Sequence, residues 1–276
     1  MISFTVDLFR FLVFGNLFIS LAAATFAAEW YVLTDNKADI LLLTFVLTST
    51  LIQYNLQRLV LIKEDEGKAR SERQVWIARH RLSLITMLIL VIPVAGILFF
   101  KMNYYQCFIA VLACGVSVFY FFPSGGLRKI GFLKPFLIAL TWSMVSVLLP
   151  WYEYGSFRPG WIFAEHFFFI FALCILFDIR DSKADRLNGV KTIPNSLGIK
   201  TAKTIALISL GLSLFSLLNH GVSWMLALAY VPCIFVVFFA SEKRKEGFYS
   251  ILADGLIILR PLATWIVYQN SILYPP

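Results

Sequence analysis

The chain has 276 residues, of which 59% are hydrophobic and only 14% are charged. This composition excludes an ordinary soluble domain and indicates an integral membrane protein. The net charge of +8 is compatible with anionic partners. However, the chain has no polar stretch that could form a soluble domain with a binding groove, so we predict no nucleic-acid partner.

Runs of largely apolar residues recur along the whole chain. Each has about 18 to 22 residues, which is enough to cross roughly 30 Å of hydrocarbon as a helix. We therefore predict an all-α polytopic membrane protein, a bundle of about nine transmembrane helices forming one domain over residues 1–276. The predicted spans cover residues 11–31, 38–58, 82–100, 104–122, 134–152, 160–178, 203–219, 222–240 and 249–269.

Basic residues are distributed unevenly between the two sides of the predicted bundle. If the N-terminus is cytoplasmic, the cytoplasmic side carries 20 of the 24 Lys and Arg residues, as expected for short loops. We therefore predict that the N-terminus and two long charged loops, residues 59–81 and 179–202, are cytoplasmic and that the C-terminus lies on the opposite side. Such a basic face would also attract anionic membrane lipids.

Three aspartates, Asp178, Asp181 and Asp185, follow the sixth predicted span. If the helix continues through them, their spacing places all three on one face. Facing carboxylates repel one another unless a cation lies between them, and Mg²⁺ prefers one or two carboxylates together with substrate phosphates. We therefore predict that these aspartates are catalytic metal ligands for Mg²⁺, as one ion or more, and that the substrate carries a diphosphate.

Two basic residues of the same loop, Arg180 and Lys191, are candidates for direct contact with phosphate oxygens. The alternative, that they only mark the cytoplasmic side, stays open. Gly189, Pro194 and Gly198 predict an ordered turn before the seventh helix.

These residues carry a resemblance to a known family. The spacing D-x-x-D-x-x-x-D, followed by G-x-x-T-x-P-x-x-x-G, resembles the second aspartate-rich motif of the UbiA superfamily of intramembrane prenyltransferases. Every position of this pattern is present in the chain: Asp178, Asp181, Asp185, Gly189, Thr192, Pro194 and Gly198.

The resemblance implies a function as well as a fold. In this family, two aspartate motifs hold the diphosphate of an isoprenyl donor through Mg²⁺. The diphosphate leaves, and an aromatic or other lipophilic acceptor attacks the allylic carbocation. The expected partners are therefore a prenyl diphosphate and a lipophilic acceptor.

The first aspartate motif of the family departs from its pattern in this chain. Asn55 is retained, but Leu56, Leu59 and Lys63 occupy the three aspartate positions. Our hypothesis is that Asn55, Arg58 and Lys63 bind substrate, with the two cations contacting phosphate in place of a metal. The alternative, that Arg58 and Lys63 only mark the membrane boundary, stays open.

A few ionisable residues fall inside the predicted spans, where such groups usually face a cavity or a partner. Asp254 and Arg260 lie six residues apart on different helix faces, so the spacing predicts no pair between them. Glu165 and His166 could form an acid/base pair, but they lie at the other end of the sixth span from the aspartates. We interpret His166 as a structural residue.

Three functions are compatible with these features. The leading prediction is an enzyme that transfers an isoprenyl group from a prenyl diphosphate to a lipophilic acceptor. A terpene cyclase of the same fold would need no acceptor. A non-catalytic homologue that binds polyprenyl phosphates would explain the altered first motif.

Overall fold

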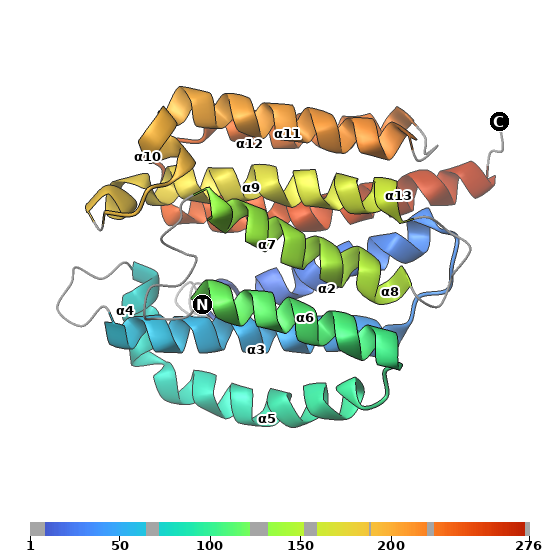
Figure 1. Cartoon of the computed structure of the whole chain (residues 1–276), viewed down its shortest axis with the longest axis horizontal. Helices are drawn as coiled ribbons and strands as arrows, with labels where there is room; N and C mark the ends of the chain where they lie inside the picture. The colour runs from blue at the N-terminus through green and yellow to red at the C-terminus, as the bar shows by residue number, and fades with distance from the viewer. Residues whose placement is uncertain are drawn as a thin grey trace, which may run out of the picture. The chain divides into compact units, whose positions relative to one another are not determined.

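The computed structural model describes residues 9–64, 72–121, 132–151, 159–187, 189–219 and 224–273, with the side chains of residues 61–64, 120–121 and 270–273 left undescribed. Within these ranges all regular secondary structure is helical (Figure 1). The all-α class predicted from the sequence is therefore confirmed.

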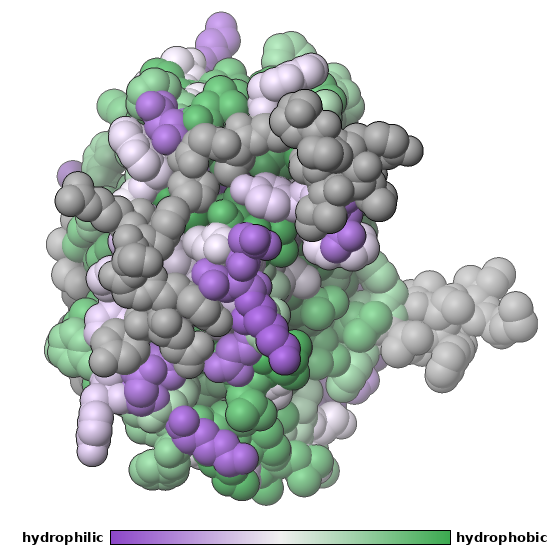
Figure 2. Space-filling model, turned by 90° about the vertical axis from the view of Figure 1, so that its right-hand side faces the viewer, coloured by the Kyte–Doolittle hydropathy of each residue, from purple (hydrophilic) through white to green (hydrophobic). Residues whose placement is uncertain are grey.

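Among the described residues, six helical segments are long and apolar enough to cross a membrane, which supports an integral membrane protein. They are Ile40–Val60, Arg81–Phe99, Leu133–Trp151, Gly160–Leu187, Ile199–Asn219 and Phe248–Gln269. Three further apolar helices are shorter: Leu17–Leu33, Tyr104–Phe119 and Trp224–Phe239. The predicted count of nine spans is not confirmed by length. Figure 2 looks onto one end of the long helices and shows hydrophilic residues together with hydrophobic ones on that face.

The chain divides into two compact units. The first comprises Met1–Thr25 and Asp39–Asn103, and the second comprises Phe26–Ala38 and Tyr104–Pro276. Because this boundary falls inside helix α2 (Leu17–Leu33), each unit contains part of that helix. The prediction of a single domain stays a prediction.

Within the first unit, α3 (Ile40–Glu64) packs along α5 (Arg81–Phe99), and the short α4 (Glu72–Arg79) contacts both. Much of the predicted loop 59–81 is therefore helical, since α3 runs on to Glu64 and α4 begins at Glu72.

A break precedes α2 at Gly15 and Asn16. A Cβ on Gly15 would lie 2.4 Å from the Phe11 carbonyl oxygen, and Asn16 has a φ of 63°, a conformation that asparagine tolerates better than most residues. The Asn16 side chain is buried and bonded to two other buried residues. Its Nδ2 donates to Asn55 Oδ1 at 3.1 Å, and its Oδ1 accepts from Arg73 Nη2 at 2.6 Å. These two hydrogen bonds connect the helix break to Asn55 of α3 and to Arg73 of α4.

The second unit is built around α9 (Gly160–Leu187), the most deeply buried of the six long helices. Helix α9 lies between α11 (Ile199–Asn219) and α7 (Leu133–Ser143) in Figure 1, and its most extensive contacts are with these two helices. The remaining elements of this unit are α6 (Tyr104–Phe121), η2 (Met144–Leu148), α8 (Leu149–Trp151), α10 (Ile193–Leu197), η4 (Trp224–Ala229), α12 (Tyr230–Phe239), η5 (Phe248–Ala253) and α13 (Asp254–Leu273).

Two of these elements are π-helical. The segment η2 joins α7 to α8, and η5 leads into α13. A π-turn inserts an extra residue into a helix and turns the side chains of that turn toward new neighbours. In η2 this turn contains Ser146, whose hydroxyl contacts a side chain of α9.

Candidate functional site

Helix α9 continues without interruption to Leu187, so the three aspartates lie on its last turns. The expectation that the helix runs through them is confirmed, and the first nine residues of the predicted loop 179–202 are therefore helical. Asp178, Asp181 and Asp185 therefore share one helix face.

Asp178 is the most buried of the three, with no exposed side-chain surface. Its Oδ1 accepts a hydrogen bond from Lys134 Nζ of α7 at 2.5 Å, and Lys134 is itself only 17% exposed. Asp178 Oδ2 is also buried, and no described residue forms a hydrogen bond with it. One oxygen of this carboxylate is thus fixed by a protein cation, while the other is buried and has no hydrogen bond that a ligand would need to replace.

Asp181 forms a bidentate ion pair with the neighbouring Arg180, whose Nε and Nη2 lie 2.8 and 2.9 Å from its two oxygens. The Arg180 guanidinium also lies 5.0 Å from the centre of the Phe177 ring. The Asp181 side chain is 37% exposed, and Asp185 is half-buried. Arg180, predicted to bind phosphate, is therefore turned toward Asp181 in this structure.

Among the described residues, no group of three or more His, Cys, Asp and Glu side chains lies close enough to hold a metal ion. The aspartates are accordingly not a preformed metal cage. They do fit Mg²⁺ that arrives with a diphosphate, because that ion takes few protein ligands and completes its shell with phosphate oxygens and water. The unbonded Asp178 Oδ2 is a suitable donor for such an ion.

The turn after α9 is an ordered turn, as its glycines and proline predict. Gly189 and Gly198 have φ values of 68° and 85°, which favour glycine, and Pro194 lies in the first turn of α10. Lys191 is exposed within this turn. Its predicted contact with phosphate stays a prediction.

Asn55, Arg58 and Lys63 belong to the first unit, on α3. Asn55 is fully buried, and its Nδ2 donates to the carbonyl oxygens of Gly15 and Leu51 at 3.0 and 2.9 Å. A direct bond from Asn55 to substrate would therefore have to replace one of these contacts. Arg58 is half-buried, and the Lys63 side chain lies outside the described residues. The substrate-binding roles of all three stay predictions.

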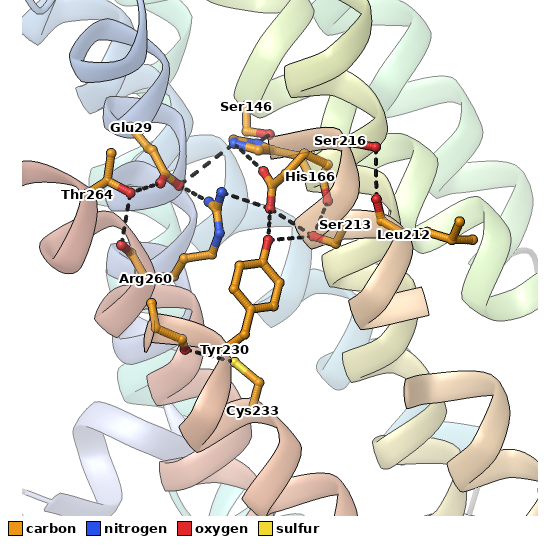
Figure 3. A network of polar contacts seen from close by, with 12 residues as sticks. Glu29, Ser146, His166, Leu212, Ser213, Ser216, Tyr230, Cys233, Arg260 and Thr264 are labelled. Carbon is orange, nitrogen blue, oxygen red and sulfur yellow. Dashed lines mark hydrogen bonds and ion pairs between the residues drawn. The ribbon is translucent and has the colours of Figure 1, made fainter. Parts of the chain in front are cut away.

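A second polar group lies in the interior of the second unit, near the start of α9 (Figure 3). At its centre, Arg260 of α13 donates from Nη1 to Glu29 of α2, and its Nη2 lies 2.8 Å from Glu165 Oε1. The members of this buried polar cluster come from α2, η2, α9, α11, α12 and α13, and each is at most 2% exposed. They are Glu29, Ser146, Glu165, His166, Ser213, Tyr230, Arg260 and Thr264.

With both sites defined, the chain can be compared with known proteins. The sequence model of the UbiA prenyltransferase family matches residues 17–247. The chain belongs to this family. The match runs through both units, and it includes the aspartates of α9 and the altered first motif.

One relative in this family matches about half of this chain. Digeranylgeranylglyceryl phosphate synthase from Sulfolobus acidocaldarius is 35% identical over 149 residues, which is 51% of this chain and 53% of that protein. The alignment therefore spans about half the length of this UbiA relative.

Solved structures show the same fold. A UbiA homologue from Aeropyrum pernix K1 superposes with a TM-score of 0.66 at 12% identity, over 91% of this chain and 97% of that one. A structure of digeranylgeranylglyceryl phosphate synthase superposes with a TM-score of 0.58 at 15% identity, covering 95% and 99% of the two chains. At these identities the likeness concerns the UbiA fold alone.

Sequence reasoning missed two features of this family member. The sequence does not predict that Lys134 contacts the motif, yet it binds the first aspartate. Glu29 drew no attention, although a carboxylate inside an apolar helix signals a buried partner. Arg260 does pair with carboxylates, but with Glu29 and Glu165.

Proposed function

We propose that this UbiA-family protein transfers an isoprenyl group from a prenyl diphosphate to a lipophilic acceptor within the membrane. The observation that supports this most is the aspartate face of α9, where Asp178 is held by Lys134 on one oxygen and has a second oxygen available. This arrangement suits a ligand that brings its own cation and negative charge, as a magnesium diphosphate does.

The residues have separate roles in this proposal. Asp178, Asp181 and Asp185 would hold Mg²⁺, which would supply positive charge to neutralise the departing diphosphate. Lys134 and Arg180, which pair with Asp178 and Asp181 in this structure, would donate to phosphate oxygens. Lys191 reaches the same phosphates from the turn after α9, and we retain Asn55, Arg58 and Lys63 as further candidates.

The relative from Sulfolobus acidocaldarius suggests a substrate class. Its name describes a glyceryl phosphate with two geranylgeranyl groups, so we propose a prenylated glyceryl phosphate as the first acceptor to test. An aromatic acceptor, which the family resemblance implies equally, is the competing choice. The cytoplasmic placement of the aspartate end follows from the distribution of basic residues and is part of the proposal.

The test is pyrophosphate release by the purified full chain in lipid. Prenyl diphosphates of several lengths would be supplied with and without Mg²⁺, each with a prenylated glyceryl phosphate, an aromatic acceptor or no acceptor. We expect release that requires both Mg²⁺ and an acceptor. Release without an acceptor, with a cyclic product, would replace transfer by cyclisation, and binding without release under any condition would indicate a non-catalytic homologue.

The variant Asp181→Ala tests the assignment of the site. We expect release to fall at least about 100-fold, equivalent to roughly 2.7 kcal/mol of transition-state stabilisation. Glu242→Gln is the matched control, because Glu242 is also paired with an arginine of α9, Arg186, at 2.5 Å. If Asp181→Ala kept the activity of this control, the aspartate face would not be the active site.

A further inference from the structure

The buried polar cluster contains more negative than positive charge. Arg260 is its one permanent cation, while Glu29 and Glu165 are two carboxylates, and none of these side chains is more than 2% exposed. With both acids ionised and His166 neutral, the described members of the cluster would carry one uncompensated negative charge. An isolated charge in such surroundings costs several kcal/mol or more, so proteins usually neutralise it.

Hydrogen bonds distinguish the two carboxylates. Both oxygens of Glu29 accept hydrogen bonds, Oε1 from the Thr264 hydroxyl and Oε2 from Arg260 Nη1. In Glu165, Oε1 accepts from Tyr230 at 2.8 Å and from Ser213 at 2.9 Å. Glu165 Oε2, by contrast, is buried and has no hydrogen-bond partner among the described residues. Glu29 is thus bonded as an anion on both oxygens, and Glu165 on one.

The imidazole of His166 faces the unbonded oxygen. Its Nδ1 lies 2.7 Å from the Ser146 hydroxyl, and its ring stacks on Phe26 with centroids 3.9 Å apart. His166 Nε2 is also buried and has no hydrogen-bond partner among the described residues. It lies 3.5 Å from Glu165 Oε2 and 3.7 Å from Glu29 Oε2. Two unbonded polar atoms, an oxygen and a nitrogen, therefore face each other inside the membrane protein.

We infer that Glu165 and His166 share one bound proton between Glu165 Oε2 and His166 Nε2. The proton gives both atoms a hydrogen-bond partner and makes the cluster electrically neutral. It is carried by Glu165 as a carboxylic acid or by His166 as an imidazolium, and the charge balance is the same in either form.

A proton fits this place better than a larger ligand does. The guanidinium of Arg260 lies between the two carboxylates and contacts both, so the space that a metal ion would use is filled. Three aromatic rings enclose the same guanidinium, with centroids 5.5 to 6.0 Å from its central carbon: Phe26, Phe169 and Tyr230. A proton needs no cavity, whereas a metal or an organic ligand does.

The bound proton makes stability depend on pH. The titratable and charged groups that face the pair are Glu29 of α2, Arg260 of α13, and Tyr230 and Cys233 of α12; tyrosine and cysteine are ordinarily uncharged at neutral pH. The folded chain keeps the shared proton at a pH where the unfolded chain has released it. Stability therefore falls as the pH rises, because the folded state then binds more protons than the unfolded state.

The test is thermal unfolding of the purified full chain in detergent, from mildly acidic to alkaline pH. Glu165→Gln and Glu29→Gln each leave one carboxylate for Arg260, so each is neutral without the extra proton. We expect the Tm of the parent chain to fall with rising pH and the Tm of both variants to change less. At the alkaline end at least one variant should be more stable than the parent. The matched control is Glu242→Gln, which removes a partly exposed paired carboxylate from the same unit and should keep the parent's pH dependence.

The outcomes separate clearly. Two results would overturn the shared proton. One is a parent chain whose Tm does not fall as the pH rises. The other is a pair of Gln variants whose Tm falls with rising pH as steeply as that of the parent chain. The failure of both Gln variants to fold would overturn it as well, because a neutral cluster is expected to be stable. The proton site is independent of the proposed prenyl transfer, since no activity is measured.

Discussion

The two ends of α9 carry charged residues in opposite settings. Near its start, Glu165 and His166 have no exposed surface and belong to the buried polar cluster. Near its end, acids are paired with bases that keep some contact with solvent, as in Asp181 with Arg180 and Glu242 with Arg186. Both ends lie on one continuous helix, about 20 Å apart at 1.5 Å per residue.

This difference indicates which charges can serve a ligand. A paired charge that reaches solvent can exchange its protein partner for a phosphate or a metal ion. An ion pair whose two members are both enclosed cannot do so without opening the fold, so its partners must come from the protein, or be as small as a proton. The exposure of the base therefore separates the two groups: Asp178 is itself enclosed, but its partner Lys134 is 17% exposed, whereas Arg260 is only 2% exposed.

The largest effect should come from the enclosed end. Arg260→Met leaves Glu29 and Glu165 without their cation, and breaking a buried ion pair in this way costs about 3–5 kcal/mol. Denaturant unfolding in micelles measures the loss. The double variant Arg260→Met/Glu29→Gln should recover part of it, because Glu29, which is left ionised without its cation, is then removed. A loss in Arg260→Met below about 1 kcal/mol would contradict a central role for this guanidinium.

A smaller effect is expected at the aspartate end. Lys134→Met removes the cation that contacts Asp178 and should cost roughly 1–3 kcal/mol. Added Mg²⁺ should restore part of this stability, because a cation from solution can then take the place of the Lys134 side chain, which is 17% exposed. Arg260→Met should gain nothing from Mg²⁺. Thermal unfolding with and without the ion checks both, and equal responses would remove the distinction between the two ends.

A single hydroxyl of the buried polar cluster should have a measurable effect. Ser213→Ala removes one donor from Glu165 Oε1 and should lower stability by about 1 kcal/mol. Ser216, about one turn further along α11, bonds only the Leu212 carbonyl of its own helix at 2.9 Å among the contacts described for it. Ser216→Ala should therefore be nearly neutral. Equal losses in the two variants would mean that the bond to Glu165 adds nothing.

The smallest effect is expected for the exposed ion pair at the aspartate end. Glu242→Gln removes the partner of Arg186, whose side chain is 56% exposed. Surface ion pairs contribute about 0–1 kcal/mol, so the Tm should hardly change. A large loss would show that even this end depends on fixed pairing.

The sequence was sufficient to predict the helical membrane class and the common helix face of the three aspartates. Long apolar runs are a local signal, and so is the spacing of Asp178, Asp181 and Asp185 within one helix. The conformations of Gly189 and Gly198 were predictable for the same reason, since each turn depends on its own residue.

The buried polar cluster could not be derived in this way. Glu29 and Arg260 are 231 residues apart, and their pairing depends on which helices are neighbours in space. The sequence did show ionisable residues in three separate apolar spans, which predicts that they have partners. It did not show that Arg260 would pair with two glutamates and not with Asp254, which is nearer in the sequence.

Because α9 is continuous, it also fixes the angle between the Glu165 and Asp178 side chains around the helix axis. Asp178 follows Glu165 by 13 positions, and at about 100° per residue the two carboxylates point roughly 140° apart around the helix axis. One added residue between them would rotate one group by about 100° relative to the other. The buried polar cluster and the aspartate face therefore point toward different neighbouring helices. Their relative direction is set by the number of residues between them on one helix, and not by a series of side-chain contacts.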